Sequence, residues 1–291
     1  MNYIDDGISI LKPKNDYIFK RIFGDEKNSD ILISFLESIL KIHINKVSIL
    51  NNELSKVNIN DKKSILDVRA TINDDTQIDI EIQLSRTAYF PERSLYYWAK
   101  MYSEQLNISE KYSRLQKTIC INIVDFEVTE KAGYHSVYKI KEKDDNYLLT
   151  DLLEIHFLEL AKLSKYSDND SLYNWLKFIS GDSREEMVKV AKTDDNIDKA
   201  FEILETISLS REERAAYLSR EMALHDEATR LSEAEERGEE RGQKRGEKIG
   251  EERGKKRKAI EIANNLLDIL DDETIALITG LSIEEVKALR K

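Results

Sequence analysis

The two stretches that decide the fold are Ile65-Leu66-Asp67-Val68-Arg69 and Ile78-Asp79-Ile80-Glu81-Ile82-Gln83. In each stretch apolar and polar residues alternate, which is the period of a half-buried β-strand. Residues 73–76, Asn-Asp-Asp-Thr, lie between the stretches and have the composition of a turn. The sequence therefore predicts a β-hairpin with acidic side chains from both strands on its polar face.

The register of this hairpin is restricted, because a slip of one residue would move an apolar set into water. Two registers remain. In one, a three-residue loop places Asp67 directly opposite Glu81, and in the other Asp67 lies opposite Gln83 and diagonal to Glu81. The Cβ atoms of opposed residues are roughly 5 Å apart, and those of diagonal residues roughly 7–8 Å. Either register brings two carboxylates and one amide together.

Two carboxylates at this separation repel each other when both are ionised. A divalent cation would offset that repulsion, and Mg2+ is commonly held by one or two carboxylates with water and phosphate oxygens. The other interpretation is a solvated sheet face whose charges lie opposite each other by chance. Spacing alone favours neither interpretation.

The composition restricts the classes of protein to which this chain can belong. The chain has 291 residues and a net charge of −11, which argues against a simple nucleic-acid binder but not against an enzyme with a local phosphate site. No apolar run is long enough to span a bilayer, and residues 1–11 lack a signal-peptide pattern, so no membrane association is expected. The single cysteine, Cys120, is expected in a core strand, and a cytoplasmic location fits these features.

Around the hairpin, hydrophobic periodicity predicts an α/β domain with the order helix, three strands, helix, strand. The helix after the hairpin should run from Pro91 to about Tyr112, and the unbroken apolar run 118–126 should form a central strand. The other elements expected here are a helical segment after Asn15 that breaks near Gly24, and strands over 46–50, 134–140 and 155–160.

Beyond residue 165 the chain is expected to be helical and polar. A long helix from Glu212 to about Lys258 contains five glycines at four-residue spacing, and residues 230–258 include eleven basic and eight acidic side chains. Each interior glycine costs roughly 1 kcal/mol of helix stability relative to alanine, so this helix would be marginal in isolation. Two interpretations remain: a glycine stripe that permits homo-oligomerisation, or a mobile charged linker.

Four motifs occur in a characteristic order: Asn15-Asp16-Tyr17-Ile18-Phe19-Lys20, Leu66-Asp67, Glu81-Ile82-Gln83 and Arg93-Ser94-Leu95-Tyr96-Tyr97. In this order and spacing they resemble the Rpn family of recombination-promoting nucleases and transposases, within the PD-(D/E)XK nuclease superfamily. The resemblance covers about residues 10–160 and, more loosely, the Arg-Gly-Glu-rich tail. It implies an α/β, restriction-endonuclease-like core with a helical C-terminal extension.

The resemblance also implies an activity: metal-dependent endonucleolytic hydrolysis of DNA phosphodiester bonds in recombination or transposition, with Mg2+ or Mn2+ as the cofactor. Asp67 and Glu81 would be the catalytic and metal-binding acids. Gln83 would be the third catalytic residue, at a position where most members carry lysine. This departure removes a positive charge that would stabilise the transition state or orient the attacking water.

Three further residues are candidates for the site, each with an alternative. Asp16 either contributes a third acid from a helix or caps that helix beside Asn15. Asp79 shares the polar strand face with Glu81, as an accessory acid or an exposed one. Arg93 either binds phosphate in a bidentate contact or pairs with a neighbouring acid.

The predicted domains are a PD-(D/E)XK nuclease-like domain over 1–165, a helical subdomain over 166–210, the glycine-repeat helix or linker over 211–258, and a three-helix unit over 259–291. Within the last unit, residues 272–290 resemble a helix-turn-helix, but Glu284 and Glu285 at the start of the second helix of that motif would repel phosphate. We therefore expect homo-oligomerisation through the C-terminal helical region. The alternative function is a catalytically weakened nuclease-fold protein that acts as an oligomeric assembly or regulatory module.

Overall fold

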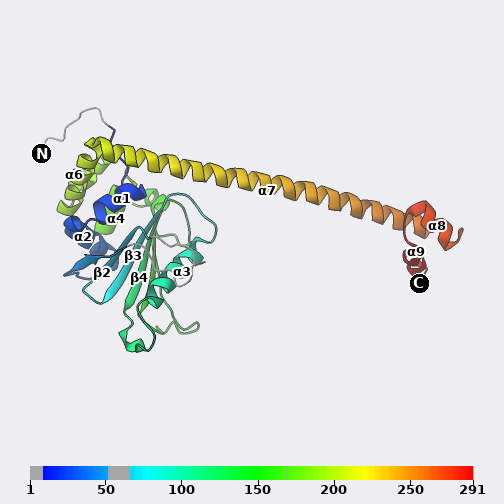
Figure 1. Ribbon diagram of the computed structural model, residues 1–291, viewed down its shortest axis with the longest axis horizontal. Helices are drawn as coiled ribbons and strands as arrows, with labels where there is room; N and C mark the ends of the chain where they lie inside the picture. Colours follow the sequence, from blue (N-terminus) through cyan, green and yellow to red (C-terminus); the bar gives the residue numbers. More distant parts are fainter. Residues whose placement is uncertain (1–8, 52–65, 169, 291) are drawn as a thin grey trace. The chain divides into compact units, whose positions relative to one another are not determined.

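A computed structural model describes residues 9–51, 66–168 and 170–290 of the chain (Figure 1). The chain forms two compact units, one over residues 1–223 and the other over residues 224–291. The first unit is an α/β domain built on one six-stranded sheet. None of the helices in the described ranges is both long enough and apolar enough to cross a membrane.

Within the described residues, six strands form the sheet: β1 (Val47–Ile49), β2 (Val68–Ile72), β3 (Thr76–Gln83), β4 (Lys117–Val124), β5 (His135–Tyr138) and β6 (Leu153–Glu159). They lie in the order β1-β2-β3-β4-β6-β5. Pairing is antiparallel across β1, β2 and β3, parallel across β3, β4 and β6, and antiparallel again between β6 and β5. The apolar run that predicted a central strand is β4, which confirms that prediction.

Helices pack on both faces of the sheet. α3 (Phe90–Ser103) connects β3 to the parallel strand β4 and packs on one face (Figure 1). The other face is covered by α1 (Asp16–Phe23) and α2 (Ser29–Leu40). The later helices of the first unit pack together with these two and share their core: α4 (Ser171–Ser180), α5 (Arg184–Ala191) and α6 (Asp195–Leu209). The order helix, three strands, helix, strand is therefore confirmed, and β6 and β5 extend the sheet.

An aromatic cluster joins the early and late helices of the first unit. Phe23 of α1, Phe35 of α2 and Trp175 of α4 are fully buried, with ring centroids 5.0 to 5.7 Å apart. These separations are in the range of favourable aromatic pairs. The helices from the region 166–210 thus share one hydrophobic core with α1 and α2. The proposed boundary at residue 165 stays a prediction.

The expected end of the helix after the hairpin was wrong: α3 ends at Ser103, not near Tyr112. Just beyond it, the Gln105 side-chain amide accepts a hydrogen bond from Gln116 N at 2.6 Å and donates to Gln116 O at 3.3 Å. These bonds return the chain toward β4. Ile108 is 98% exposed, so its side chain adds no burial that would stabilise further helical turns.

The polar face of β3 is also more buried than its alternation predicted. Asp79 and Glu81 are 1% and 7% exposed, because α3 packs over this face of the sheet. Ile78, Ile80 and Ile82 occupy the opposite face and contribute to the main core. A solvated sheet face is therefore the wrong interpretation of these acids, and so is an exposed Asp79.

The helices of the C-terminal region are α7 (Arg211–Leu266), α8 (Asp272–Thr279) and α9 (Ile283–Leu289). α7 begins in the first unit and continues through all five spaced glycines. It also passes the predicted end near Lys258, so its last turns are the first helix of the expected three-helix unit. Ala263, Ile275 and Val286 form the small core of that unit, and Ser282 with Glu285 forms the capping box that opens α9.

Candidate active site

The hairpin of β2 and β3 has the register with a three-residue loop. Val68 pairs with Ile80 and Arg69 with Asp79, so Asp67, directly before β2, comes opposite Glu81. The loop, residues 73–75, turns through left-handed backbone at Asn73 (φ 50°) and Asp74 (φ 61°). Asn and Asp tolerate this conformation better than most residues do. The structure thus selects one of the two registers that the alternation allowed.

Asp67 and Glu81 are tied together by reciprocal hydrogen bonds. The Asp67 amide donates to Oε1 of Glu81 at 3.0 Å, and the Ile82 amide donates to Oδ2 of Asp67 at 2.9 Å. Each carboxylate is therefore held by backbone of the opposite strand. The pair sits where the parallel strands β3 and β4 end, an edge that commonly holds ligands in α/β folds.

A lysine from α1 completes the immediate surroundings of this acid pair. Lys20 Nζ lies 2.9 Å from Oδ1 of Asp67, and the two side chains are 33% and 13% exposed. Lys20 belongs to the first of the four family motifs, but no role was predicted for it. The available signal was its spacing, because Lys20 is four residues after Asp16 and so shares a helix face with that acid.

Burial dominates the electrostatics of the acids. It raises the pKa of Asp67, although the Lys20 ammonium and the Ile82 amide oppose the rise. Burial, followed by repulsion from Asp79 and Asp67, raises the pKa of Glu81 well above its usual value. Removing water disfavours the charged form of a carboxyl, and a like charge nearby adds to that cost. Lys20 and Arg93 thus compensate the charge of the acids only in part.

Gln83 binds Arg93 rather than facing open solvent. Oε1 of Gln83 accepts from Nη2 of Arg93 at 2.9 Å, and Nε2 of Gln83 donates to the carbonyl of Ser85 at 3.2 Å. The Arg93 guanidinium also lies over the rings of Phe90 and Tyr97, at 4.8 and 5.8 Å from their centroids. Arg93 forms no ion pair with an acid among the residues that the structure describes, but its guanidinium is near enough to Glu81 to oppose the rise in the pKa of that acid.

Asp79 lies deeper under α3 than Glu81 does. Its neighbours are Cys120 of β4, whose thiol hydrogen-bonds the Asp79 carboxyl, and Arg69 of β2, which is directly opposite. Burial and the charge of Asp67 raise the pKa of Asp79 to about 8. Asp79 therefore lines the base of the acid cluster.

Asp16 stands at the start of α1 and is engaged by α7. Both of its carboxylate oxygens accept from Nε of Arg220 at 2.8 Å, and Oδ1 also accepts from the Tyr17 amide at 2.9 Å. Asn15 is the N-cap, since its side chain accepts from the same amide at 3.0 Å. Asp16 is close enough to Asp67 to raise the pKa of that acid. Asp16 thus accepts from an amide at the start of α1, forms an ion pair with Arg220 and also lies near Asp67.

The donor chemistry fits a divalent cation bound by two carboxylates. Asp67 and Glu81 offer hard oxygen ligands at one point of the fold, as Mg2+ or Mn2+ requires. Within the described ranges no group of three His, Cys, Asp or Glu side chains converges as a ready-made metal cage. Water and phosphate oxygens would have to supply the remaining ligands, which is usual for Mg2+.

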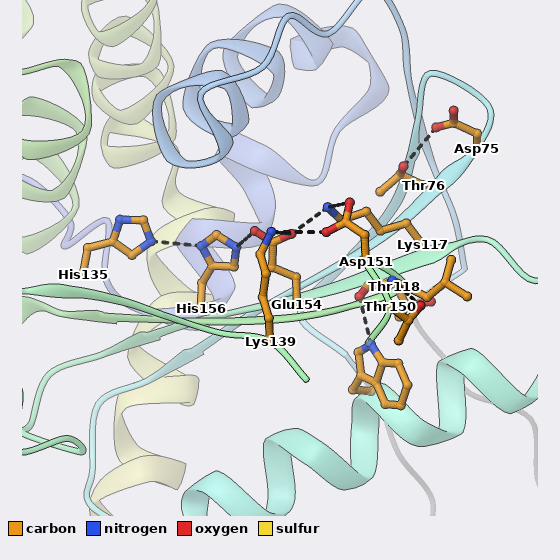
Figure 2. A network of polar contacts seen from close by, with 12 residues as sticks. Asp75, Thr76, Lys117, Thr118, His135, Lys139, Thr150, Asp151, Glu154 and His156 are labelled. Carbon is orange, nitrogen blue, oxygen red and sulfur yellow. Dashed lines mark hydrogen bonds and ion pairs between the residues drawn. The ribbon is translucent and has the colours of Figure 1, made fainter. Parts of the chain in front are cut away.

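A separate polar network lies on the opposite face of the sheet (Figure 2). His135 Nε2 is 2.9 Å from His156 Nδ1, and His156 Nε2 is 3.1 Å from Oε1 of Glu154. The other oxygen of Glu154 lies 2.7 Å from Lys117 Nζ and 3.3 Å from Lys139 Nζ. Glu154 and His156 alternate along β6 with residues that pack under α3, so this network does not join the acid cluster.

Comparison with known proteins assigns the first unit to a known sequence family. The sequence model of the PD-(D/E)XK nuclease family transposases matches residues 13–234. The match includes α1, the hairpin, α3 and the helices α4 to α6. Neither the curated proteins nor the solved structures yield a match to the chain.

Proposed function

Since this chain belongs to the PD-(D/E)XK nuclease family transposases, we propose that it is a divalent-metal-dependent endonuclease that hydrolyses DNA phosphodiester bonds in recombination or transposition. The observation that carries this proposal is the reciprocal hydrogen bonding of Asp67 and Glu81 at the end of the hairpin. Two acids held in this way, buried and beside a lysine, form a site for a cation and a phosphate.

Each side chain has a distinct part in the proposed reaction. Asp67 and Glu81 would hold Mg2+ or Mn2+, and a bound metal ion lowers the pKa of water and polarises a phosphoryl oxygen. Lys20 orients Asp67 and brings to this point a positive charge that residue 83 does not supply. Gln83 holds the Arg93 guanidinium in place, and Arg93 would bind a phosphate oxygen of the DNA.

The alternative function, a catalytically weakened module, also has an observation in its favour. Lys20 already pairs with Asp67, and both ends of the Gln83 amide are engaged by Arg93 and Ser85. A metal ion would have to compete with the lysine for Oδ1 of Asp67. The two functions differ in whether metal-dependent cleavage depends on Asp67.

A plasmid-nicking assay with Mg2+ or Mn2+ tests the proposal. Wild type should nick the plasmid, and Asp67→Ala should lose roughly a hundredfold or more of that activity, because even residues that merely orient metal ligands cost 10–100-fold when removed. Asp75→Ala is the matched control, since Asp75 lies at the opposite end of the same hairpin and is exposed. Nicking by Asp67→Ala at the wild-type rate would contradict the mechanism and leave the alternative.

A second copy of the chain is the other partner that we propose, through the C-terminal helical region. Several large apolar side chains of that region are exposed: Ile269 is 72%, Leu277 86% and Ile278 57% exposed. A small unit with a core as limited as that of α8 and α9 leaves apolar surface that association would bury.

A further inference from the structure

A cavity of about 660 Å3 lies on the α3 side of the sheet in the first unit. Ile155 and Phe157 of β6 line it from the sheet, and Pro91 and Leu95 line it from α3. Tyr138 of β5 forms a third side. Leu95 and Tyr138 are 49% and 42% exposed, so this cavity opens to solvent with an apolar and aromatic lining.

The fourth side of this cavity, residues 128–131, is fixed by a buried ion pair. Oε1 of Glu159 accepts from the Val128 and Thr129 amides, both at 2.7 Å. Lys162 Nζ contacts Glu159 and donates to the carbonyls of Thr129 at 2.8 Å and Lys131 at 2.7 Å. The side chains of Glu159 and Lys162 are almost fully buried, so they fix the backbone of residues 128–131 from the protein interior. The cavity is therefore preformed.

Direct contacts connect the cavity to Arg93 and Gln83. Phe157, in the cavity lining, packs against Phe90 with a centroid distance of 6.2 Å. The Arg93 guanidinium lies over the same Phe90 ring, 4.8 Å from its centroid, and donates to Gln83 at 2.9 Å. The first turn of α3 therefore separates an apolar cavity on one side from the phosphate-binding candidate on the other.

The occupant that suits this arrangement is a flat ring attached to a phosphate. A nucleobase has an apolar π-face for contact with Tyr138 and a polar edge for the loop at Glu130 and Lys131. A base that is stacked and paired within a duplex cannot enter such a cavity, so the nucleotide must be single-stranded or turned out of the helix. The cavity volume is within the range of small-ligand sites.

We propose that the cavity between α3 and the β5–β6 edge binds an unpaired nucleobase of the DNA next to the phosphate held at Arg93. This inference rests on the proposed nuclease function and specifies its substrate class: DNA with an unpaired base beside the cleavage site. The base contacts the Tyr138 ring and the apolar side of α3, and the backbone of the DNA crosses the first turn of α3 toward Asp67 and Glu81.

Fluorescence anisotropy of the full chain without metal tests this inference. The probes are a short single-stranded DNA, the same strand with abasic sites, and the same strand in a duplex. We expect the intact single strand to bind most tightly. Tyr138→Ser should weaken its binding about tenfold, in the range measured for loss of one base–aromatic stack. Tyr138→Phe, which keeps the ring, should bind as wild type does.

Two further variants distinguish loss of the base-binding site from a general loss of folding. Leu95→Gln changes the α3 side of the cavity with a good helix former and should also weaken the intact single strand. Tyr112→Ser is the matched control, because Tyr112 is 82% exposed and precedes the opposite end of β4. Equal affinity for intact and abasic strands, or unchanged binding by both Tyr138→Ser and Leu95→Gln, would overturn the inference.

The inference and the proposed function fail separately. Suppose that nicking depends on Asp67 but changes neither in Tyr138→Ser nor with unpaired bases in the DNA. This result would support the nuclease function and contradict the base-binding site. If binding depends on the bases but the chain nicks no DNA with Mg2+ or Mn2+, the base-binding site is supported and the nuclease function is contradicted.

Discussion

At the scale of single residues, the site depends on which positively charged side chain lies next to each acid. Residue 83 is glutamine, and its amide holds Arg93, while the ammonium that contacts Asp67 comes from Lys20 of a different element. Arg and Lys are not equivalent in such positions, because guanidinium binds phosphate as a planar fork and ammonium acts as a point charge. The positive charge in contact with Asp67 is therefore supplied from α1.

The first residue-scale prediction concerns Lys20. Lys20→Met should reduce Mg2+-dependent nicking by about 10–100-fold, the usual effect of removing a group that orients a metal ligand. Lys20→Arg, which keeps the charge, should retain more activity. Lys27→Met is the control, because Lys27 is exposed on the neighbouring 3-10 turn. Wild-type nicking by Lys20→Met would show that the charge of Lys20 is dispensable.

The second residue-scale prediction concerns the pH dependence of stability. Burial and the neighbouring charges of His156 and Lys41 lower the pKa of His135 to about 4, against 6.5 in the unfolded chain, while Asp170 and Glu154 oppose this shift. Protonating both rings would set two N–H groups against each other across 2.9 Å. Between pH 6.5 and 4 the unfolded chain therefore binds more protons at this residue, so stability falls as the pH falls.

Urea denaturation of wild type and His135→Gln over this pH range measures the effect. The difference in the free energy of unfolding should change by up to ~1.4 kcal/mol per pH unit, the limit for one proton. Below pH 4 the contribution should level off. His225→Gln, at an exposed position of α7, should follow the wild-type slope. Parallel pH profiles for wild type and His135→Gln would contradict the assignment.

At the scale of elements, the hairpin and α3 depend on different kinds of information. The hairpin register is set by local alternation and by two residues that accept left-handed backbone, Asn73 and Asp74. The end of α3 is set instead by Gln105 contacting Gln116, and by the lack of a core that would cover Ile108. Periodicity reduced the hairpin to two registers, of which the structure has one, and it predicted a helix that is longer than α3.

The element-scale prediction concerns the glycines of α7. A Cβ added at Gly242 or Gly246 would meet nothing within 4 Å, so alanine fits without a clash. Each Gly→Ala change should stabilise the helix by roughly 1 kcal/mol. Hydrogen exchange of the α7 amides should slow in the double variant Gly242→Ala, Gly246→Ala. Unchanged exchange would contradict the expectation, and loss of self-association in sedimentation would assign the oligomer contact to the glycine stripe.

At the scale of the whole molecule, the start of α7 belongs to the first unit. Tyr17 and Arg21 of α1 bind Glu213, and the buried Asn15 side chain donates to Glu221 at 2.8 Å. Arg220 holds Asp16. The first turns of α7 thus anchor the helix that carries Lys20, which is consistent with a family match that ends inside α7.

The whole-molecule prediction uses two truncations. A chain ending at Ala223 should fold and remain monomeric in light scattering, whereas the full chain should self-associate. A chain that ends at Ser210 loses the contacts of Glu213, Arg220 and Glu221, and its melting temperature should fall by roughly 2–4 °C for each kcal/mol lost. Equal melting temperatures of the two truncations would show that the α7 contacts do not stabilise α1.

The sequence alone determined the hairpin strands, the placing of Asp67 and Glu81 on one face of the hairpin and the presence of a long charged helix. These features depend on the local period of apolar residues and on turn composition, which are visible without coordinates. The sequence could not show that α3 buries Asp79 and Glu81, because strand alternation describes one sheet and not what packs on it.

Only the tertiary structure decided which distant residues meet the acids. Lys20 lies 47 positions before Asp67 in the chain, and the cavity beside α3 unites β5, β6 and residues 128–131. Contacts between residues far apart in sequence follow from the packing of whole elements around a core, and no periodic pattern encodes them. The acid pair was therefore predictable, while the lysine beside it and the cavity next to it were not.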